Sequence, residues 1–223
     1  MPIRRFRPGR RLRRRPRNMI RRRPVIRRTR APQRMMAHWF KRTCKLGNIS
    51  ASISGGVPSG IASAYSFSLS QLPNMTEFTN LYDQYKITGA KISFVPGATE
   101  ALYSPLSGVA SQHGYNRFHS VIDYDDSTPP VSEDQMLQYQ SCKTTNGLRT
   151  HTRFLKPKVL REVYRSALTT GYNPTASQWI DTVQNDVPHY GLKVWCDAPF
   201  SSTNASITYT VYLTLYFGCK NVR

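Results

Sequence analysis

The chain has 223 residues, 39% of them hydrophobic, and a formal net charge of +20 from 32 Lys and Arg against 12 Asp and Glu. No apolar run reaches the roughly 18–20 residues of a membrane-spanning helix, and the first residues lack the apolar core of a signal peptide. The four cysteines, Cys44, Cys142, Cys196 and Cys219, form no Cys-x-x-Cys pair, so we expect reduced thiols rather than a metal knuckle or a disulfide framework.

The positive charge is concentrated in residues 1–45. This segment has 17 Arg and 2 Lys and no acidic residue, whereas residues 77–223 have 13 basic and 12 acidic residues. It has too few apolar groups to offset a backbone ordering cost of about 1–2 kcal/mol per residue, so we expect a disordered arm. Regularly spaced prolines disfavour a helix and favour an extended chain: Pro2, Pro8, Pro16, Pro24 and Pro32.

Arginine dominates this arm, and its planar guanidinium contacts phosphate in a bidentate way and stacks on exposed bases. The composition therefore predicts salt-sensitive nucleic-acid binding that is indifferent to sequence. A solvated tail or an anchor to an anionic membrane is the alternative, although the arm offers no amphipathic apolar face. The Arg clusters at 13–15 and 21–23 also fit a nuclear import signal. The candidate nucleic-acid-binding residues are Arg4, Arg5, Arg7, Arg10, Arg11, Arg13, Arg14, Arg15, Arg17, Arg21, Arg22, Arg23, Arg27, Arg28, Arg30, Arg34, Lys41, Arg42 and Lys45.

After the arm, residues 46–223 suit one domain with one hydrophobic core. At the transition, Trp39 and Phe40 interleave with basic residues. These two rings either anchor the arm to the folded body or stack on nucleic-acid bases, and both interpretations stay open. The first strand is expected at residues 43–53, and the alternation of residues 65–70 predicts another.

Aromatic and leucine residues at three- and four-residue spacing predict a short helix at 76–85, with Thr76 as its cap. Residues 85–96 form a strand whose apolar parity changes, and a bulge at Gly89 would realign its faces. Residues 99–115 have the composition of a loop, and residues 117–124 form a further strand.

A second short helix is expected at 133–139, capped by Ser132, followed by a strand at 148–155. Residues 161–188 are interpreted as mostly connection, with Trp179 and Ile180 as contacts to the core. The last strands are expected at 190–196 and 206–217, the latter with one uninterrupted apolar face. About eight strands with period-two alternation predict an all-β fold of antiparallel sheets packed face to face, most economically a single jelly-roll sandwich; another sandwich or a barrel stays possible.

With these elements placed, the sequence resembles the capsid proteins of circoviruses and related small circular single-stranded DNA viruses. The Arg-rich start leads into a β body of suitable size. The stretch YDQYKI at 82–87 followed by KISFVP at 91–96 is similar to the family's tyrosine–x–isoleucine strand ending on phenylalanine and proline. HTRFLKPK at 151–158 resembles its histidine–x–arginine–aromatic–x–x–proline segment, and the last strand agrees in place and pattern.

The resemblance implies a jelly-roll capsid domain at 46–223, a basic arm at 1–45, self-assembly into a sixty-subunit icosahedral shell and packaging of single-stranded DNA. It implies a location in the virion, and in the host nucleus during assembly, with nuclear import receptors as further partners; it identifies no attachment receptor. Sixty arms of 19 charges would supply roughly 1,100 cations, the scale of a one-to-two-kilobase single strand.

The main alternative is a ribosomal or nucleoprotein-like RNA-binding β domain with a basic extension. An enzyme is not expected, because no histidine has a nucleophile or carboxylate at a recognised spacing and no phosphate-binding glycine loop occurs. His119 with Asp123, Asp125 and Asp126 matches no known cation loop, so we expect neither a metal site nor a cofactor.

Overall fold

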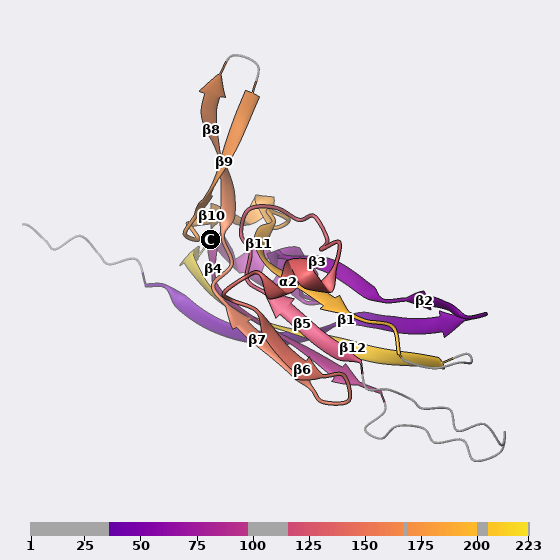
Figure 1. Ribbon diagram of the computed structural model, residues 1–223. Coiled ribbons are helices and arrows are strands. Elements are labelled where there is room, and N and C mark those ends of the chain that lie inside the picture. Colours follow the sequence, from indigo (N-terminus) through magenta and orange to yellow (C-terminus); the bar gives the residue numbers. More distant parts are fainter. Residues whose placement is uncertain (1–35, 98–115, 167–168, 200–204, 223) are drawn as a thin grey trace, which may run out of the picture. The chain divides into compact units, whose positions relative to one another are not determined.

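The computed structural model describes residues 36–97, 116–166, 169–199 and 205–222, and these residues form an all-β body (Figure 1). Its strands are β1 (His38–Ser54), β2 (Val57–Ser59), β3 (Ile61–Phe67), β4 (Tyr82–Pro96), β5 (Arg117–Val121), β6 (Lys143–Asn146), β7 (His151–Leu155), β8 (Val159–Ser166), β9 (Thr169–Thr175), β10 (Ile180–Asp181), β11 (His189–Cys196) and β12 (Ala205–Val222). Its helices are the short η1 (Leu69–Gln71), α1 (Met75–Leu81), α2 (Glu133–Leu137) and η3 (Thr182–Gln184). None of the helices in these ranges is long and apolar enough to cross a membrane.

Ten of these strands form two sheets that face each other, and β8 and β9 form a separate two-stranded sheet. One has the order β7-β4-β12-β1; the short β2 pairs with the end of β1, and β10 pairs with the same edge of β4 as β7. The other has the order β3-β11-β5-β6, and all pairings are antiparallel. The eight main strands are β1, β3, β4, β5, β6, β7, β11 and β12. Numbered 1 to 8 in this chain order, they form sheets of order 6-3-8-1 and 2-7-4-5, which is the jelly-roll connectivity. The predicted fold class is therefore confirmed.

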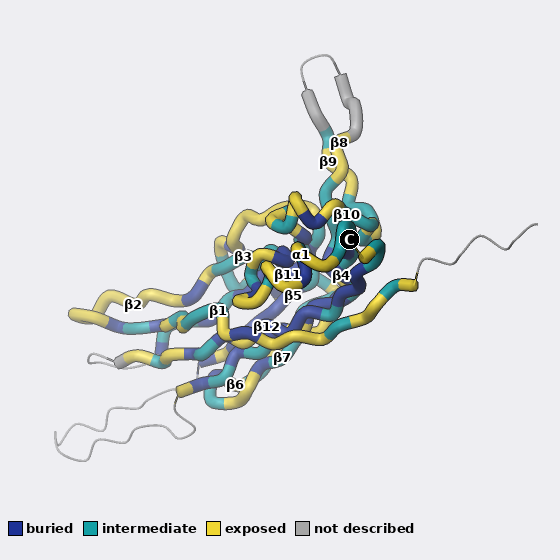
Figure 2. The backbone as a smooth tube through the Cα atoms, turned by 180° about the vertical axis from the view of Figure 1, so that it is seen from behind, coloured by how far each residue is buried: buried dark blue, intermediate teal, exposed yellow. Residues whose placement is uncertain are grey.

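The core lies between the two sheets, and β12 contributes every second side chain to it. Its predicted apolar face is confirmed, because Tyr209, Leu213 and Phe217 are fully buried. The Phe217 ring packs edge-on against Phe78 of α1, with ring centroids 5.0 Å apart. Residues of the same strand at the other parity are more exposed, as the alternating colours of the tube in Figure 2 show.

The predicted bulge in β4 is confirmed. Tyr216 pairs with Gly89 but the next residue, Phe217, pairs with Ile87, so Thr88 is the extra residue. Its hydroxyl donates to the Tyr216 carbonyl over 3.0 Å. Because one residue is inserted, Ile87 and Ala90 both face the core and the parity change in the sequence disappears.

The helices differ in how well their caps were predicted. Ser132 caps α2, since its Oγ accepts a hydrogen bond from the Gln135 amide at 3.2 Å. Thr76 is not a cap: α1 begins at Met75, and Asn74 occupies the N-cap position without a capping hydrogen bond from its side chain. The helix also ends at Leu81 rather than at residue 85, because Tyr82 already pairs with Val222 in the sheet.

The prediction of connection at 161–188 was wrong. β8 and β9 form a hairpin there, and β10 with η3 follows. The hairpin contains Arg161 and Glu162 at neighbouring positions and Gly171 and Pro174 on its second strand. Such a sequence has no apolar face, so the hydrophobic period that marks other strands is missing and the pairing depends on backbone hydrogen bonds.

Candidate nucleic-acid interface

Three of the nineteen predicted binding residues lie on described structure. Lys41, Arg42 and Lys45 belong to β1, which begins at His38; the sixteen candidates from Arg4 to Arg34 lie outside the described residues. In β1 the side chains alternate between the two faces of the sheet. Lys41 and Lys45 therefore share one face, and Arg42 lies on the other.

We call the surface of sheet β7-β4-β12-β1 that is turned away from the core the outer face. The register places five lysines on it: Lys41, Lys45, Lys86, Lys91 and Lys220. β1, β7 and β12 contain no acidic residue, and Asp83, the acidic residue of β4, shares the parity of the buried Tyr85. The outer face of these four strands is therefore positively charged; the acidic residue of the same sheet at this parity is Asp181 of β10, which is exposed and pairs opposite Gln84.

Exposed aromatic rings lie over this face where the neighbouring strands carry glycine. A Cβ atom at Gly218 would come within 2.7 Å of the Trp39 ring, and one at Gly89 within 2.9 Å of the Phe154 ring. Trp39 nevertheless remains 61% exposed and Phe154 54% exposed. Each ring thus lies close to backbone that has no side chain and remains more than half exposed to solvent.

Lysines and rings interleave across the outer face. Lys41 Nζ lies 5.9 Å from the centre of the Tyr216 ring, and Lys220 Nζ lies 4.6 Å from that of Trp179. The Trp39 and Trp179 rings are 6.2 Å apart. Cations held beside partly exposed π surfaces suit single-stranded nucleic acid, whose phosphates and unstacked bases are both accessible.

The structure separates the two interpretations of the aromatic pair at the end of the arm. Phe40 turns inward and contacts Phe78 and Phe217 at ring-centre distances of 5.0 and 5.6 Å, so it anchors the strand. Trp39 turns to the outer face and stays exposed, as base stacking requires. Neighbouring residues of one strand therefore take the two alternative positions.

Three further cations of the body contact other side chains or backbone groups within it. Arg42 lies with its guanidinium carbon 5.6 Å from the Phe78 ring. Arg153 donates to the Ser141 carbonyl, and Lys158 Nζ lies 4.4 Å from the Tyr124 ring. These three side chains do not extend the outer face.

The outer face includes residues that were not among the sequence candidates. Lys86 and Lys91 lie on opposite sides of the bulge in β4, and only the extra residue at Thr88 puts both on one face. Phe154 was part of a predicted strand, but its pairing opposite Lys91 sets its position beside Tyr216. The alternation on the two sides of the predicted bulge could have placed Lys86 and Lys91 on one face. The pairing of β7 with β4, which positions Phe154, has no signal in the sequence.

Comparison with known proteins gives one family. A family model described as Circovirus capsid protein matches residues 7–223. The crystal structure of a 60-mer of BFDV capsid protein is 19% identical, with a TM-score of 0.59, and the match covers 84% of this chain and 95% of that one. The structure of decameric BFDV capsid protein is 20% identical, with a TM-score of 0.50, over 83% and 100% of the two chains. No curated protein matches the sequence. At these identities the structures establish a shared fold.

Proposed function

The chain belongs to the circovirus capsid protein family, and we propose that its Arg-rich arm and the outer face together hold a single-stranded DNA genome inside the shell. As a viral capsid protein it forms shells, and both its family and its structural neighbours are shell proteins rather than enzymes. The observation that carries the proposal is the continuity of the chain. The arm of unbroken positive charge leads directly into β1, the strand that presents Trp39, Lys41 and Lys45.

The arm supplies most of the binding free energy. Residues 1–45 carry 19 cations without an anion, and this composition supports non-specific contact with phosphate. Ten engaged phosphates of a single strand would give a log–log salt slope of about −7. Residues 46–223 form the proposed capsid domain, and residues 38–45 belong both to the basic arm and to β1, the first strand of the sheet.

The outer face adds stacking to this electrostatic contact. A base lying on Trp39 or Phe154 would bury an exposed ring, and base–aromatic stacking contributes about 1–3 kcal/mol per base. The nearby lysines would neutralise phosphates of the same strand. Because stacking needs unpaired bases, this surface favours single-stranded over double-stranded nucleic acid.

A closed shell concentrates the arms. We propose a sixty-subunit icosahedral particle, a number supported by the 60-mer described for BFDV capsid protein. Roughly 1,100 arm cations would then repel one another unless nucleic acid is present, so assembly is coupled to the cargo. The Arg clusters at 13–15 and 21–23 would direct the free subunit to the host nucleus through import receptors.

The test removes the arm without damaging the sheet. Truncation after Arg34 retains β1, whereas truncation after Lys45 would delete its first eight residues. We expect the truncated chain to keep its β-type circular dichroism spectrum and to lose nuclease-protected nucleic acid. Uniform closed particles of the full chain in electron microscopy would support a shell, and co-purification with a larger RNA assembly would support the RNA-binding alternative. Undiminished nucleic-acid protection in the truncated chain would contradict the proposal.

A further inference from the structure

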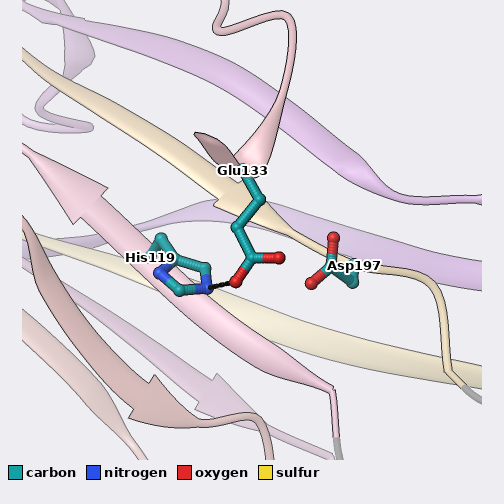
Figure 3. A group of neighbouring side chains, drawn as sticks. All are labelled: His119, Glu133 and Asp197. Atoms are coloured by element: carbon teal, nitrogen blue, oxygen red, sulfur yellow. Dashed lines mark ion pairs between the residues drawn. The ribbon is translucent and has the colours of Figure 1, made fainter. Parts of the chain in front are cut away.

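A second cluster of chemically active side chains lies on the opposite sheet, away from the outer face. His119 alternates with Phe118 and Ser120 of β5, which face the core, so its imidazole points to the far side of sheet β3-β11-β5-β6. The α2 segment covers it there, and the side chain is 1% exposed. Glu133, the first residue of α2, and Asp197, which follows β11, approach the same imidazole (Figure 3).

The donor atoms of these three residues lie within reach of a single ion. One nitrogen or oxygen from each of His119, Glu133 and Asp197 lies within 4.8 Å of the others. His119 Nε2 is 2.9 Å from Glu133 Oε1. That nitrogen is fully enclosed yet forms no hydrogen bond in the described structure, so the carboxylate oxygen lies off the direction of a ring N–H. A buried nitrogen therefore points into the cluster without a directed partner.

The groups around the cluster hold two of the donors in place. The other ring nitrogen of His119, Nδ1, lies 2.9 Å from Thr144 Oγ1 on β6. Asp197 Oδ1 accepts a hydrogen bond of 2.7 Å from the Trp195 indole nitrogen. Hydrogen bonds of this kind fix the orientation of metal-ligating histidines and carboxylates. The arrangement is organised before any ion enters.

We propose that His119 Nε2, Glu133 and Asp197 form a binding site for one divalent transition-metal ion, with Zn²⁺ as the best match. One imidazole nitrogen and two carboxylate oxygens suit zinc, whereas Ca²⁺ and Mg²⁺ prefer oxygen ligands alone. Three protein ligands leave a tetrahedral position for water. The ion would join β5, α2 and the end of β11.

The neighbouring acidic residues are engaged elsewhere. Lys193 Nζ lies 2.9 Å from Asp123 Oδ2 and also contacts Asp126, so the carboxylates that follow β5 in sequence neutralise a lysine. The sequence expectation of no metal site was based on those residues. The structure brings His119 instead to Glu133 and Asp197, which are 14 and 78 positions away in the chain.

Binding would fasten the α2 segment to the sheet and stabilise the native subunit. At a Zn²⁺ concentration about 100-fold above the dissociation constant, linkage predicts a Tm increase of roughly 5–10 °C. The experiment uses the full chain, freed of nucleic acid by nuclease and high salt and treated with a chelator. Zn²⁺ is titrated by calorimetry and by thermal unfolding, and Co²⁺ is added separately to record its visible absorption.

Three conservative variants test the ligands individually: His119→Gln, Glu133→Gln and Asp197→Asn. We expect one Zn²⁺ per chain for the wild type and at least tenfold weaker binding in each variant, with loss of the Tm increase. Glu133 is one-third exposed on a short helix, so its variant tests the proposal even if replacement of the buried His119 prevents folding.

Two control variants exclude other sites. Asp134→Asn removes the carboxylate next to Glu133, and Cys142→Ser removes the least buried of the four thiols. Both should bind Zn²⁺ as the wild type does. Wild-type affinity in Glu133→Gln and Asp197→Asn, or no binding below about 100 µM Zn²⁺, would show that His119 and Glu133 form an ion pair only and would overturn the proposal.

Discussion

His151 and Ser120 connect the two sheets through the core: His151 Nε2 on β7 lies 2.7 Å from Ser120 Oγ on β5. The other ring nitrogen, Nδ1, lies 2.7 Å from Thr145 Oγ1 on β6, and the ring packs 4.9 Å from Phe118. Burial lowers the pKa of His151 to about 4, with smaller contributions from the nearby charges of Lys143 and Arg153. A neutral imidazole at this position satisfies both hydroxyls without placing a charge in the core.

The first prediction is acid sensitivity from His151. Above the unfolded pKa of about 6.5 both states are neutral and the histidine adds no pH dependence. Below it the unfolded chain takes up a proton that the folded chain binds only near pH 4, so the free energy of unfolding falls with acid by about 3 kcal/mol in this window. Urea unfolding of dissociated subunits between pH 7 and pH 4 measures the decrease.

His151→Gln is the matched variant for that measurement. It should be less stable at pH 7, since a buried network is disturbed, but its stability should depend less on pH between 6.5 and 4. His38→Gln, at an exposed position on β1, should retain the wild-type pH dependence. An unchanged slope in His151→Gln would assign the acid sensitivity to other groups, of which His189 is the first candidate because burial also lowers its pKa.

The second prediction separates adjacent cations of β1. Lys41→Gln should reduce the magnitude of the log–log salt slope for single-stranded DNA binding by about 0.7, because one phosphate contact is lost. Arg42→Gln should leave the slope unchanged, because Arg42 lies on the other face against Phe78. Fluorescence anisotropy of a labelled oligothymidine at several salt concentrations measures both. Equal effects of the two substitutions would argue against binding on the outer face.

The third prediction tests stacking without changing charge. In Gly218→Ala the new methyl group would occupy the position of the Trp39 ring, which would have to move away. We expect the variant to bind single-stranded DNA about tenfold more weakly while its salt slope stays that of the wild type, since stacking of one base contributes roughly 1–3 kcal/mol. Asn48→Ala, exposed on the same strand as Trp39, should bind normally. Normal affinity in Gly218→Ala would remove Trp39 from the interface.

The fourth prediction concerns the buried lysine of β11. Lys193 is 7% exposed and neutralises Asp123, which is 9% exposed, and the more exposed Asp126. Lys193→Met would leave the Asp123 carboxylate buried without its cation, with hydrogen bonds from the Tyr139 hydroxyl and the Asp125 amide remaining, so we expect a loss of about 3–5 kcal/mol in unfolding free energy. Chemical denaturation measures this loss, with the exposed Lys156→Met as the control. A change below about 1 kcal/mol would indicate that water replaces the lysine.

The sequence was informative where burial repeats at a fixed period. The alternation of β12, the parity change at Gly89 and the Ser132 cap are local patterns, and each predicted its element correctly. The hairpin of β8 and β9 was missed because it lacks an apolar face and therefore has no such pattern. The local sequence indicates which side of a strand is buried, but it gives little indication of strands such as β8 and β9 that pair without packing on the core.

The candidate sites depended on information of another kind. The charge of the arm was readable from composition alone, but the positions of Trp39 and Phe154 require knowing that the neighbouring strands β12 and β4 place Gly218 and Gly89 next to the rings. Likewise His119, Glu133 and Asp197 meet through the packing of α2 on a sheet, and no spacing in the chain encodes this contact. Lateral strand pairing and segment packing determine both sites.

β1 has a mechanical role that follows from its register. It pairs with β12 along nearly its whole length, from His38 opposite Cys219 to Ile53 opposite Ala205. A pull on the arm along the strand axis therefore loads this ladder in shear, with many hydrogen bonds sharing the force at once, rather than opening them one after another. If bound nucleic acid pulls on the arm while it is compacted, the force would act on the β1–β12 pairing, the longest among the described strands, in the direction in which it resists most.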